Sequence, residues 1–190
     1  MQTFWEGGQY ANLGSGTRTK KVGFMGFKVY NIALYVEAQP ATAALRQTRL
    51  RDETPNTVCA ALAQGQFRKV VQFQMLRDVT STQFKDGLRE NLVPNVKQYG
   101  GEKYLDTFMS FFDHKKIAKG TVIPLLWSTD GSLTLDVFPP GFSQFSSARP
   151  SLRIDSNAFC QAVFDIYLSP ESIVPDGRKR WTASALQMAK

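Results

Sequence analysis

The sequence contains only one histidine and two cysteines in 190 residues. A serine–histidine hydrolase or a histidine metal site needs partners that the single His114 cannot supply. Cys59 and Cys160 lie in apolar contexts that are typical of helices, which favours free buried thiols over a disulfide. We therefore expect no metal and no cofactor.

Long apolar runs and concentrated charge are also missing. No run is long enough to span a bilayer, and no charged region followed by an apolar one opens the chain as in a secretory signal. The net charge is +7 and the pI about 9.5, yet the only tight basic run is "GRKR" at 177–180. Without an RNP-like motif, a cysteine/histidine finger or an arginine-rich helix, we expect no nucleic-acid partner.

What the chain does contain is enough apolar material for a substantial core. Apolar residues make up 43% and aromatic residues 12%, with 14 phenylalanines. The length suits a single domain over residues 1–190, which we expect to be a soluble monomer. Phenylalanines at this frequency either fill the core or line a cavity.

Strand signals fall in five parts of the chain. Residues 1–16 are glycine-rich and predict an approach segment with one short strand, in which "GSG" at 14–16 is a turn. The other predicted strands are two strands within 17–37 joined at "GFMG", one at 67–79, a hairpin at 121–138 with "DG" at its turn, and a short run at 152–154. The second strand of 17–37 is apolar on both faces, which predicts that it is covered on both sides.

Helix signals alternate with these strands. The predicted helices are 40–48, 55–65, 80–97, 102–117, 155–168 and a last, basic helix near the C-terminus. Pro94 is expected to kink or end the third of them. Hairpin-type strand links with helices between them predict an α+β fold, in which helices gather on one face of an antiparallel sheet. A slot between the two layers could hold a flat or elongated ligand.

Arg18 and Tyr30 are unusual residues for a half-buried hairpin. They are twelve positions apart, so strands of this length can bring them together on one face unless the turn adds an odd residue. A guanidinium beside a phenol at the end of an apolar slot would bind a carboxylate. Alternatively, Arg18 is a solvated strand-end cation and Tyr30 an ordinary core residue.

A second polar residue interrupts an apolar helical stripe. Phe84, Leu88 and Asn91 follow one another at helical spacing, so they share one face of the predicted helix. An asparagine there needs hydrogen-bond partners, which are either backbone groups or a polar group of a ligand.

Several blocks together resemble the chalcone isomerase family. They are "GTRTKKVGFMGFKVYNIALYVE", "LRDVTSTQFKDGLRENL", "GTVIPLLWSTDGSLTLDVF" and "FCQAVFDIYLSPESIVPDGRKR", spread over residues 13–182. The resemblance implies an open-faced β-sandwich, with a large antiparallel sheet, a layer of helices and a ligand cleft between them. It also implies one of two functions, cyclisation of a chalcone to a flavanone or binding of a fatty acid.

The family positions of the catalytic set fall on Arg18, Tyr30, Phe84, Asn91 and Ile166. Catalytic members carry a threonine where Tyr30 stands, a tyrosine where Phe84 stands, and a threonine or serine where Ile166 stands. Phe84 and Ile166 cannot donate a hydrogen bond. The pair of Arg18 and Tyr30 resembles the carboxylate site of the fatty-acid-binding branch.

These residues favour a non-catalytic fatty-acid-binding protein of the chalcone isomerase-like branch. Its expected ligand residues are Arg18, Tyr30, Phe84, Leu88, Asn91 and Ile166, with the carboxylate on Arg18 and Tyr30 and the tail in the apolar cleft. One alternative is a chalcone–flavanone isomerase with an altered active site. Another is a basic accessory protein that uses the "GRKR" run to bind a partner or an anionic membrane. The resemblance implies a plastid location only if a transit peptide has been removed.

Overall fold

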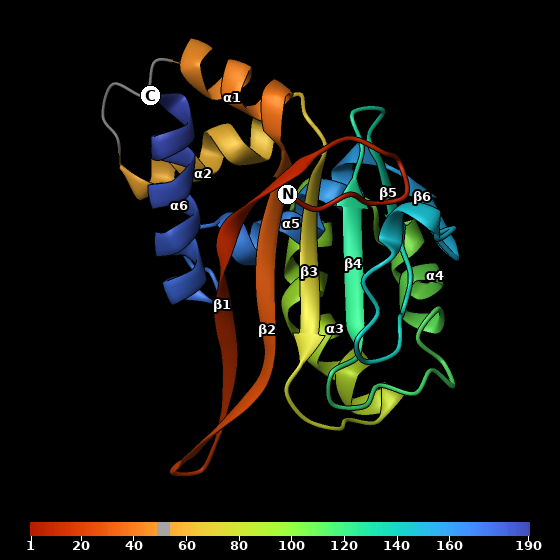
Figure 1. The fold of residues 1–190 in the computed structure, drawn as a ribbon. Coiled ribbons are helices and arrows are strands. Elements are labelled where there is room, and N and C mark those ends of the chain that lie inside the picture. Colours follow the sequence, from red (N-terminus) through yellow and green to blue (C-terminus); the bar gives the residue numbers. More distant parts are fainter. Residues whose placement is uncertain (49–53) are drawn as a thin grey trace.

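A six-stranded antiparallel sheet forms the centre of the computed structural model, which describes residues 1–48 and 54–190. The strands lie side by side in chain order, and the sheet is open rather than closed (Figure 1). Their bounds are β1 Tyr10–Val22, β2 Met25–Glu37, β3 Lys69–Met75, β4 Val122–Trp127, β5 Ser132–Leu135 and β6 Leu152–Asp155. The expected α+β architecture is confirmed.

The helices pack behind the sheet and beside its first strand. Helices α3 and α5 lie behind the strands, and α6 lies beside β1 (Figure 1). The bounds are α1 Ala38–Gln47, α2 Pro55–Gln64, α3 Ser81–Tyr99, α4 Leu105–Ser110, α5 Asn157–Leu168 and α6 Pro175–Ala189, with short 3-10 helices η1 at Glu102–Tyr104 and η2 at Phe145–Ser147.

Strand β2 is covered on both faces, as its sequence predicts. The residues that face the helices are Tyr30, Ile32, Leu34 and Val36, all of which belong to the main core. On the other face, Tyr35 packs against a second cluster that contains Phe4, Tyr10 and Phe145. The N-terminal segment and the chain between β5 and β6 supply most of this second cluster, which explains why both faces of the sheet can be apolar.

Strand β1 is longer than expected. It begins at Tyr10, so "GSG" lies inside the strand and the prediction of a turn there is wrong. The pairing with β2 is irregular between Asn12 and Ser15, and Gly14 has a φ of 111°. A Cβ on Gly16 would lie 2.5 Å from the Cα of Gly177 in α6. The glycines therefore serve a bulge and a close approach between β1 and α6.

Two helix boundaries also differ from the prediction. Helix α3 continues through Pro94 and ends only before Gly100, since buried Leu88, Leu92 and Val96 hold the turns on both sides of the proline. The helix predicted over 102–117 ends at Ser110, and a turn follows in which His114 has a φ of 61°. That left-handed backbone cannot continue a right-handed helix.

The remaining expectations about special sites concern thiols, metals and membranes. Cys59 and Cys160 are both free and buried, which confirms the prediction. Among the described residues, no three histidine, cysteine or acidic side chains are grouped so that they could hold a metal ion. The same residues include no helix with the length and apolar character that crossing a membrane requires.

Candidate functional site

The β1–β2 hairpin places Arg18 directly opposite Tyr30. Residues that face each other across an antiparallel pair share one side of the sheet, so both side chains lie on the side of the helices. The register shifts by one residue immediately after Arg18, where Thr19 pairs with Lys28. This irregularity lies beyond the pair and therefore leaves it in register. Tyr30 is 8% exposed and Arg18 is half-buried.

The phenol of Tyr30 is held among other aromatic rings. Its ring lies 4.9 Å from that of Phe73, edge to face. Burial raises the pKa of Tyr30 to about 12, although the side chains of Tyr167 and Arg18 act in the opposite direction. The hydroxyl therefore keeps its proton at neutral pH and can donate a hydrogen bond.

The guanidinium of Arg18 is only weakly satisfied by the protein. Its Nη1 donates to the backbone carbonyl oxygen of Ile173 at a long 3.4 Å. Within residues 1–48 and 54–190, no carboxylate forms an ion pair with it. Arginine offers five N–H donors in a planar fork, so most of its donors remain available to an anion.

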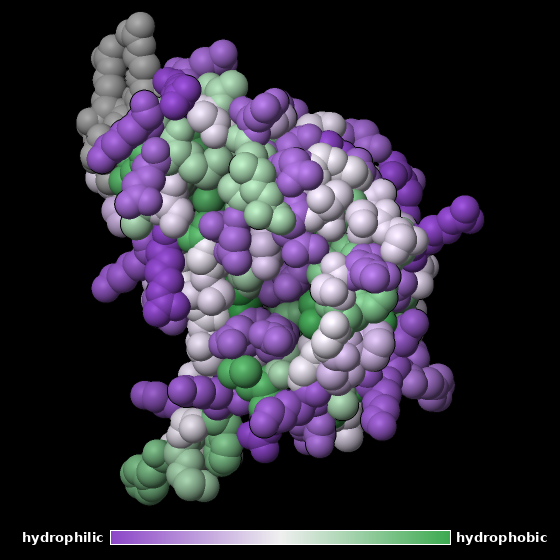
Figure 2. All heavy atoms as spheres, in the orientation of Figure 1, coloured by the Kyte–Doolittle hydropathy of each residue, from purple (hydrophilic) through white to green (hydrophobic). Residues whose placement is uncertain are grey.

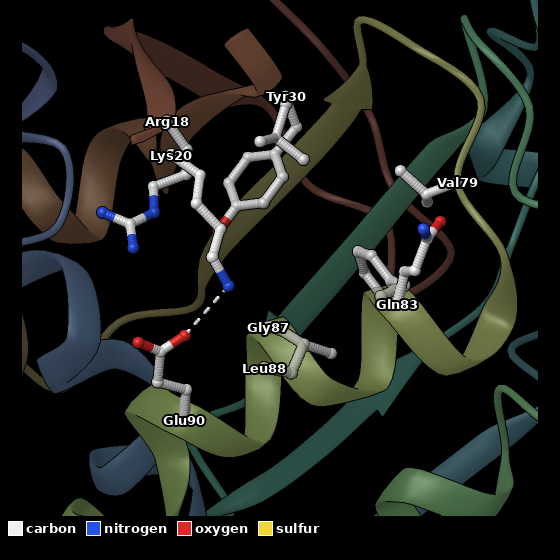
Figure 3. Close-up of a pocket in the computed structure, with 10 residues that line it drawn as sticks. Arg18, Lys20, Tyr30, Val79, Gln83, Gly87, Leu88 and Glu90 are labelled. Atoms are coloured by element: carbon white, nitrogen blue, oxygen red, sulfur yellow. Dashed lines mark hydrogen bonds and ion pairs between the residues drawn. The ribbon is translucent and has the colours of Figure 1, made fainter. Parts of the chain in front are cut away.

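A pocket opens between this part of the hairpin and helix α3, and we call it the hairpin pocket (Figure 3). Its volume is about 480 Å³ when the open mouth is included. Its lining residues are Arg18, Lys20, Val29, Tyr30, Val79, Gln83, Phe84, Gly87, Leu88 and Glu90. Apolar side chains thus lie next to the guanidinium and the phenol.

An ion pair joins the two elements that line the hairpin pocket. Lys20 Nζ on β1 lies 3.3 Å from Glu90 Oε2 on α3, as Figure 3 shows. The two side chains are 53% and 60% exposed. Exposed pairs of this kind contribute about 0–1 kcal/mol, so the contact can open at little cost.

Four of the six predicted ligand residues meet at the hairpin pocket, namely Arg18, Tyr30, Phe84 and Leu88. Asn91 and Ile166 are not among its lining residues. The Asn91 Nδ2 donates to the carbonyl oxygen of Gly87 at 2.8 Å, one turn earlier in α3. Ile166 is buried on α5, where it belongs to the main core.

Aromatic rings pack against one another between the sheet and the helices. Phe73 lies at the centre, with the ring of Phe84 at 6.0 Å and that of Tyr167 at 5.9 Å. Phe84 in turn packs against Phe112 at 5.1 Å. The slot expected from the sequence is thus filled by aromatic side chains, and the hairpin pocket lies at its edge.

Comparison with known proteins decides the family. A sequence model described as chalcone isomerase-like matches residues 5–176. The chain belongs to the chalcone isomerase-like family. This confirms the resemblance inferred from the sequence blocks.

Relatives of this chalcone isomerase-like protein include chalcone–flavanone isomerase 1 of Fragaria ananassa, which is 25% identical over 178 residues, covering 87% of this chain and 73% of the relative. The chalcone–flavanone isomerase of Oryza sativa subsp. japonica is 24% identical over 187 residues, covering 93% and 80%. A crystal structure of the Arabidopsis thaliana fatty-acid binding protein AtFAP1 matches with a TM-score of 0.81 and 17% identity, covering 95% of this chain and 90% of that one. The structural likeness supports the fold.

Sequence reasoning missed several groups at the site of this chalcone isomerase-like protein. The sequence does not indicate Lys20 and Glu90, because their contact joins two segments that are far apart in the chain. Gly87 lies one turn after Gln83 on the face of α3 that lines the pocket, which helical spacing could have indicated. Tyr167 follows Ile166 directly, but no sequence signal indicates that its side chain interacts with that of Tyr30.

Proposed function

We propose that this protein binds a fatty acid without converting it. In this proposal the carboxylate lies on the guanidinium of Arg18 and the hydroxyl of Tyr30, and the tail runs along the apolar wall of the hairpin pocket. The family pattern also includes Asn91 and Ile166. In this proposal these two residues would contact the ligand only where it extends beyond the hairpin pocket.

One observation carries the proposal. Arg18, with no ion pair among the described residues, lies directly across the hairpin from a neutral, buried phenol. A guanidinium binds a carboxylate through two parallel hydrogen bonds, and charge-assisted bonds are about twice as strong as neutral ones. A phenol whose pKa is raised to about 12 adds a donor and brings no competing negative charge.

The apolar wall suits an acyl chain, although the pocket is small. Ligand pockets usually enclose about 300–1,000 Å³, and the hairpin pocket reaches that size only when its open mouth is counted. A long tail therefore has to displace the ring of Phe84 or follow the surface. Each methylene that becomes buried contributes about 0.8 kcal/mol, which favours such a rearrangement. The fatty-acid-binding name of AtFAP1, which shares the fold, supports the same ligand class.

A chalcone–flavanone isomerase is the second candidate, because the relatives identified by sequence carry that activity in their names. Its family pattern needs a hydroxyl where Phe84 and Ile166 stand, and Tyr30 fills space that a flat substrate would use. Loss of one preorganised donor typically costs about 10²–10³-fold in rate. Cyclisation of a chalcone faster than the uncatalysed reaction, and lost in Arg18→Ala, would establish this candidate instead.

The proposal is tested by calorimetric titration with dodecanoic and hexadecanoic acids. We expect Arg18→Ala to weaken binding about 10- to 100-fold, because a hydrogen-bonded charge contributes about 1.5–3 kcal/mol. Tyr30→Phe, which removes one neutral donor, should weaken binding about 3- to 10-fold. Arg89→Ala removes an exposed arginine from α3 and serves as the matched control.

The methyl esters of the same acids separate the head from the tail. They lack the negative charge, so the unaltered protein should bind them about as weakly as Arg18→Ala binds the free acids. Equal affinity of the unaltered protein for acid and ester, or no binding of either acid, would contradict the proposed carboxylate site.

A further inference from the structure

We propose that the tip of the β1–β2 hairpin docks this protein onto an anionic lipid surface. Phe24 and Met25 would reach the boundary of the acyl chains, and Lys21 and Lys28 would lie among the lipid phosphates. The docking does not depend on the proposed fatty-acid binding.

The hairpin extends beyond the rest of the sheet. Strand β3 pairs with β2 only from Tyr30 onwards, whereas β1 and β2 remain paired as far as Val22 and Met25. In Figure 1 the two strands project past the ends of β3 and β4 as a free ribbon. The turn at its end is made by Gly23, whose φ is 60°.

The end of this ribbon carries large apolar side chains in full contact with solvent. Phe24 is wholly exposed, and Met25 is 63% exposed. Figure 2 shows apolar side chains gathered at this projecting end, with hydrophilic ones where it joins the body. Exposed apolar groups gathered at one place mark interaction sites, whereas single ones need no explanation.

Two lysines flank the apolar tip at a distance that suits contact with lipid phosphates. Lys21 and Lys28 are exposed, and neither forms an ion pair with any residue that the structure describes. Lys28 is three residues from Met25 along β2, which is about 10 Å at the rise of a β-strand, and Lys21 lies on the opposite strand nearer the turn. The headgroup layer on each side of a bilayer is about 5–8 Å thick. Lysines set back by this distance meet phosphates when the tip meets acyl chains.

A lipid surface fits the tip better than a folded protein partner does. The tip is narrow and convex, whereas stable protein interfaces bury about 1,200–2,000 Å² over complementary surfaces. The basic run at 177–180 is a weaker candidate, because its arginines bind backbone carbonyls. Arg178 donates to Leu168 and Arg180 donates to Ser15. Those two guanidiniums are already hydrogen-bonded within the fold.

Docking by the tip would bring the hairpin pocket close to the bilayer. Lys20 lines the pocket and is adjacent in sequence to Lys21. If the protein carries fatty acids, as proposed above, this arrangement would place the binding site beside their source. This consequence rests on the proposed function, but the docking itself does not.

The test is co-sedimentation with vesicles that contain no free fatty acid. The vesicles are phosphatidylcholine alone, or phosphatidylcholine with 30% phosphatidylglycerol (about one anionic lipid in three). We expect binding to the anionic vesicles, weakened at least about 10-fold by Phe24→Ser with Met25→Ser and by Lys21→Glu with Lys28→Glu. Higher salt should weaken the binding of the unaltered protein, because it screens exposed charges.

A control variant separates the tip from general charge attraction. Lys97→Glu with Lys179→Glu changes the net charge by the same amount at two exposed positions on α3 and α6. It should bind nearly as well as the unaltered protein. An equal loss in this control, or no effect of the serine variant, would overturn the proposal, as would absence of binding to the anionic vesicles. Because these vesicles hold no fatty acid, failure here leaves the titration results unaffected.

Discussion

Lys69 is an unusual residue because its side chain is almost fully buried. It is 2% exposed, and its Nζ donates to the carbonyl oxygens of Ala63 at 2.9 Å and Gly65 at 3.0 Å. It also lies 4.3 Å from the centre of the Trp127 ring. These carbonyls belong to the end of α2, where the helix leaves acceptors without partners. Lys69 thus caps α2 from the neighbouring strand.

Stability should depend on pH through this lysine. Burial lowers the pKa of Lys69 from its usual 10.5 to about 7 in the folded protein. Above pH 7 the folded state loses this proton while the unfolded state keeps it, so the free energy of unfolding should rise with pH. We expect Lys69→Met to remove a slope of at most about 1.4 kcal/mol per pH unit between pH 7 and 9. Urea unfolding at several pH values measures it.

The matched control is Lys97→Met, because Lys97 is exposed on α3. It should leave the pH dependence of unfolding unchanged. If the unaltered protein and Lys69→Met show the same slope, Lys69 titrates at its ordinary pKa and the inferred cost of burial is wrong.

The sequence permits prediction of the central pair of the candidate site but little of its surroundings. The spacing of Arg18 and Tyr30 within a hairpin is a local property, so it can be read from the chain. The role of Lys69 and the contact of Lys20 with Glu90 depend on how separate elements pack. Nothing in the local sequence indicates either contact.

At the scale of elements, helix α3 forms one wall of the hairpin pocket. Gly87 lies in this wall and contributes no side chain to it. A Cβ at this position would meet no atom within 4 Å. We expect Gly87→Leu to place a side chain in the pocket and to weaken dodecanoic acid binding at least about 10-fold, because the leucine takes up space that the ligand needs. Calorimetric titration measures the change.

Gly87→Ala is the control for this substitution. It should raise the free energy of unfolding by about 0.5–1 kcal/mol, since alanine favours a helix more than glycine does. Its effect on binding should be smaller than that of leucine. Unchanged binding in Gly87→Leu, with the fold intact by circular dichroism, would show that the ligand does not use this pocket.

Element types are easier to predict here than their ends. Alternating apolar residues predict β2, β4 and β5, β-branched and aromatic residues predict β3, and Thr80 as a cap predicts the start of α3, where it bonds with Gln83. The errors have tertiary causes. Strand β1 extends back to Tyr10, which is buried in the second cluster, and α4 ends before the turn in which His114 has a left-handed backbone. Neither constraint is visible in local propensity.

At the scale of the whole molecule, the sheet separates two cores, and the smaller one depends on the N-terminal segment. Phe4 is completely buried, and its ring packs against those of Tyr10, Tyr35 and Phe145 at 5.1–5.4 Å. We expect Phe4→Ala to lower the free energy of unfolding by about 3–5 kcal/mol, as for other buried phenylalanines. Urea unfolding measures the difference.

Phe24→Ala is the same substitution at the exposed hairpin tip. It should change the free energy of unfolding by no more than about 0.5 kcal/mol. Similar values for the two variants would mean that the N-terminal segment contributes little to stability and that the second core is incidental.

The contact between β1 and α6 also affects how the protein folds during its synthesis. The indole nitrogen of Trp181 donates to the carbonyl oxygen of Gly14, 167 residues earlier in the chain. Chains are synthesised at about 5–20 residues per second, so the first strand waits for many seconds before this helix leaves the ribosome. During that time the flank of β1 that meets α6 lacks its cover, and a chaperone that shields this flank would raise the yield of native protein.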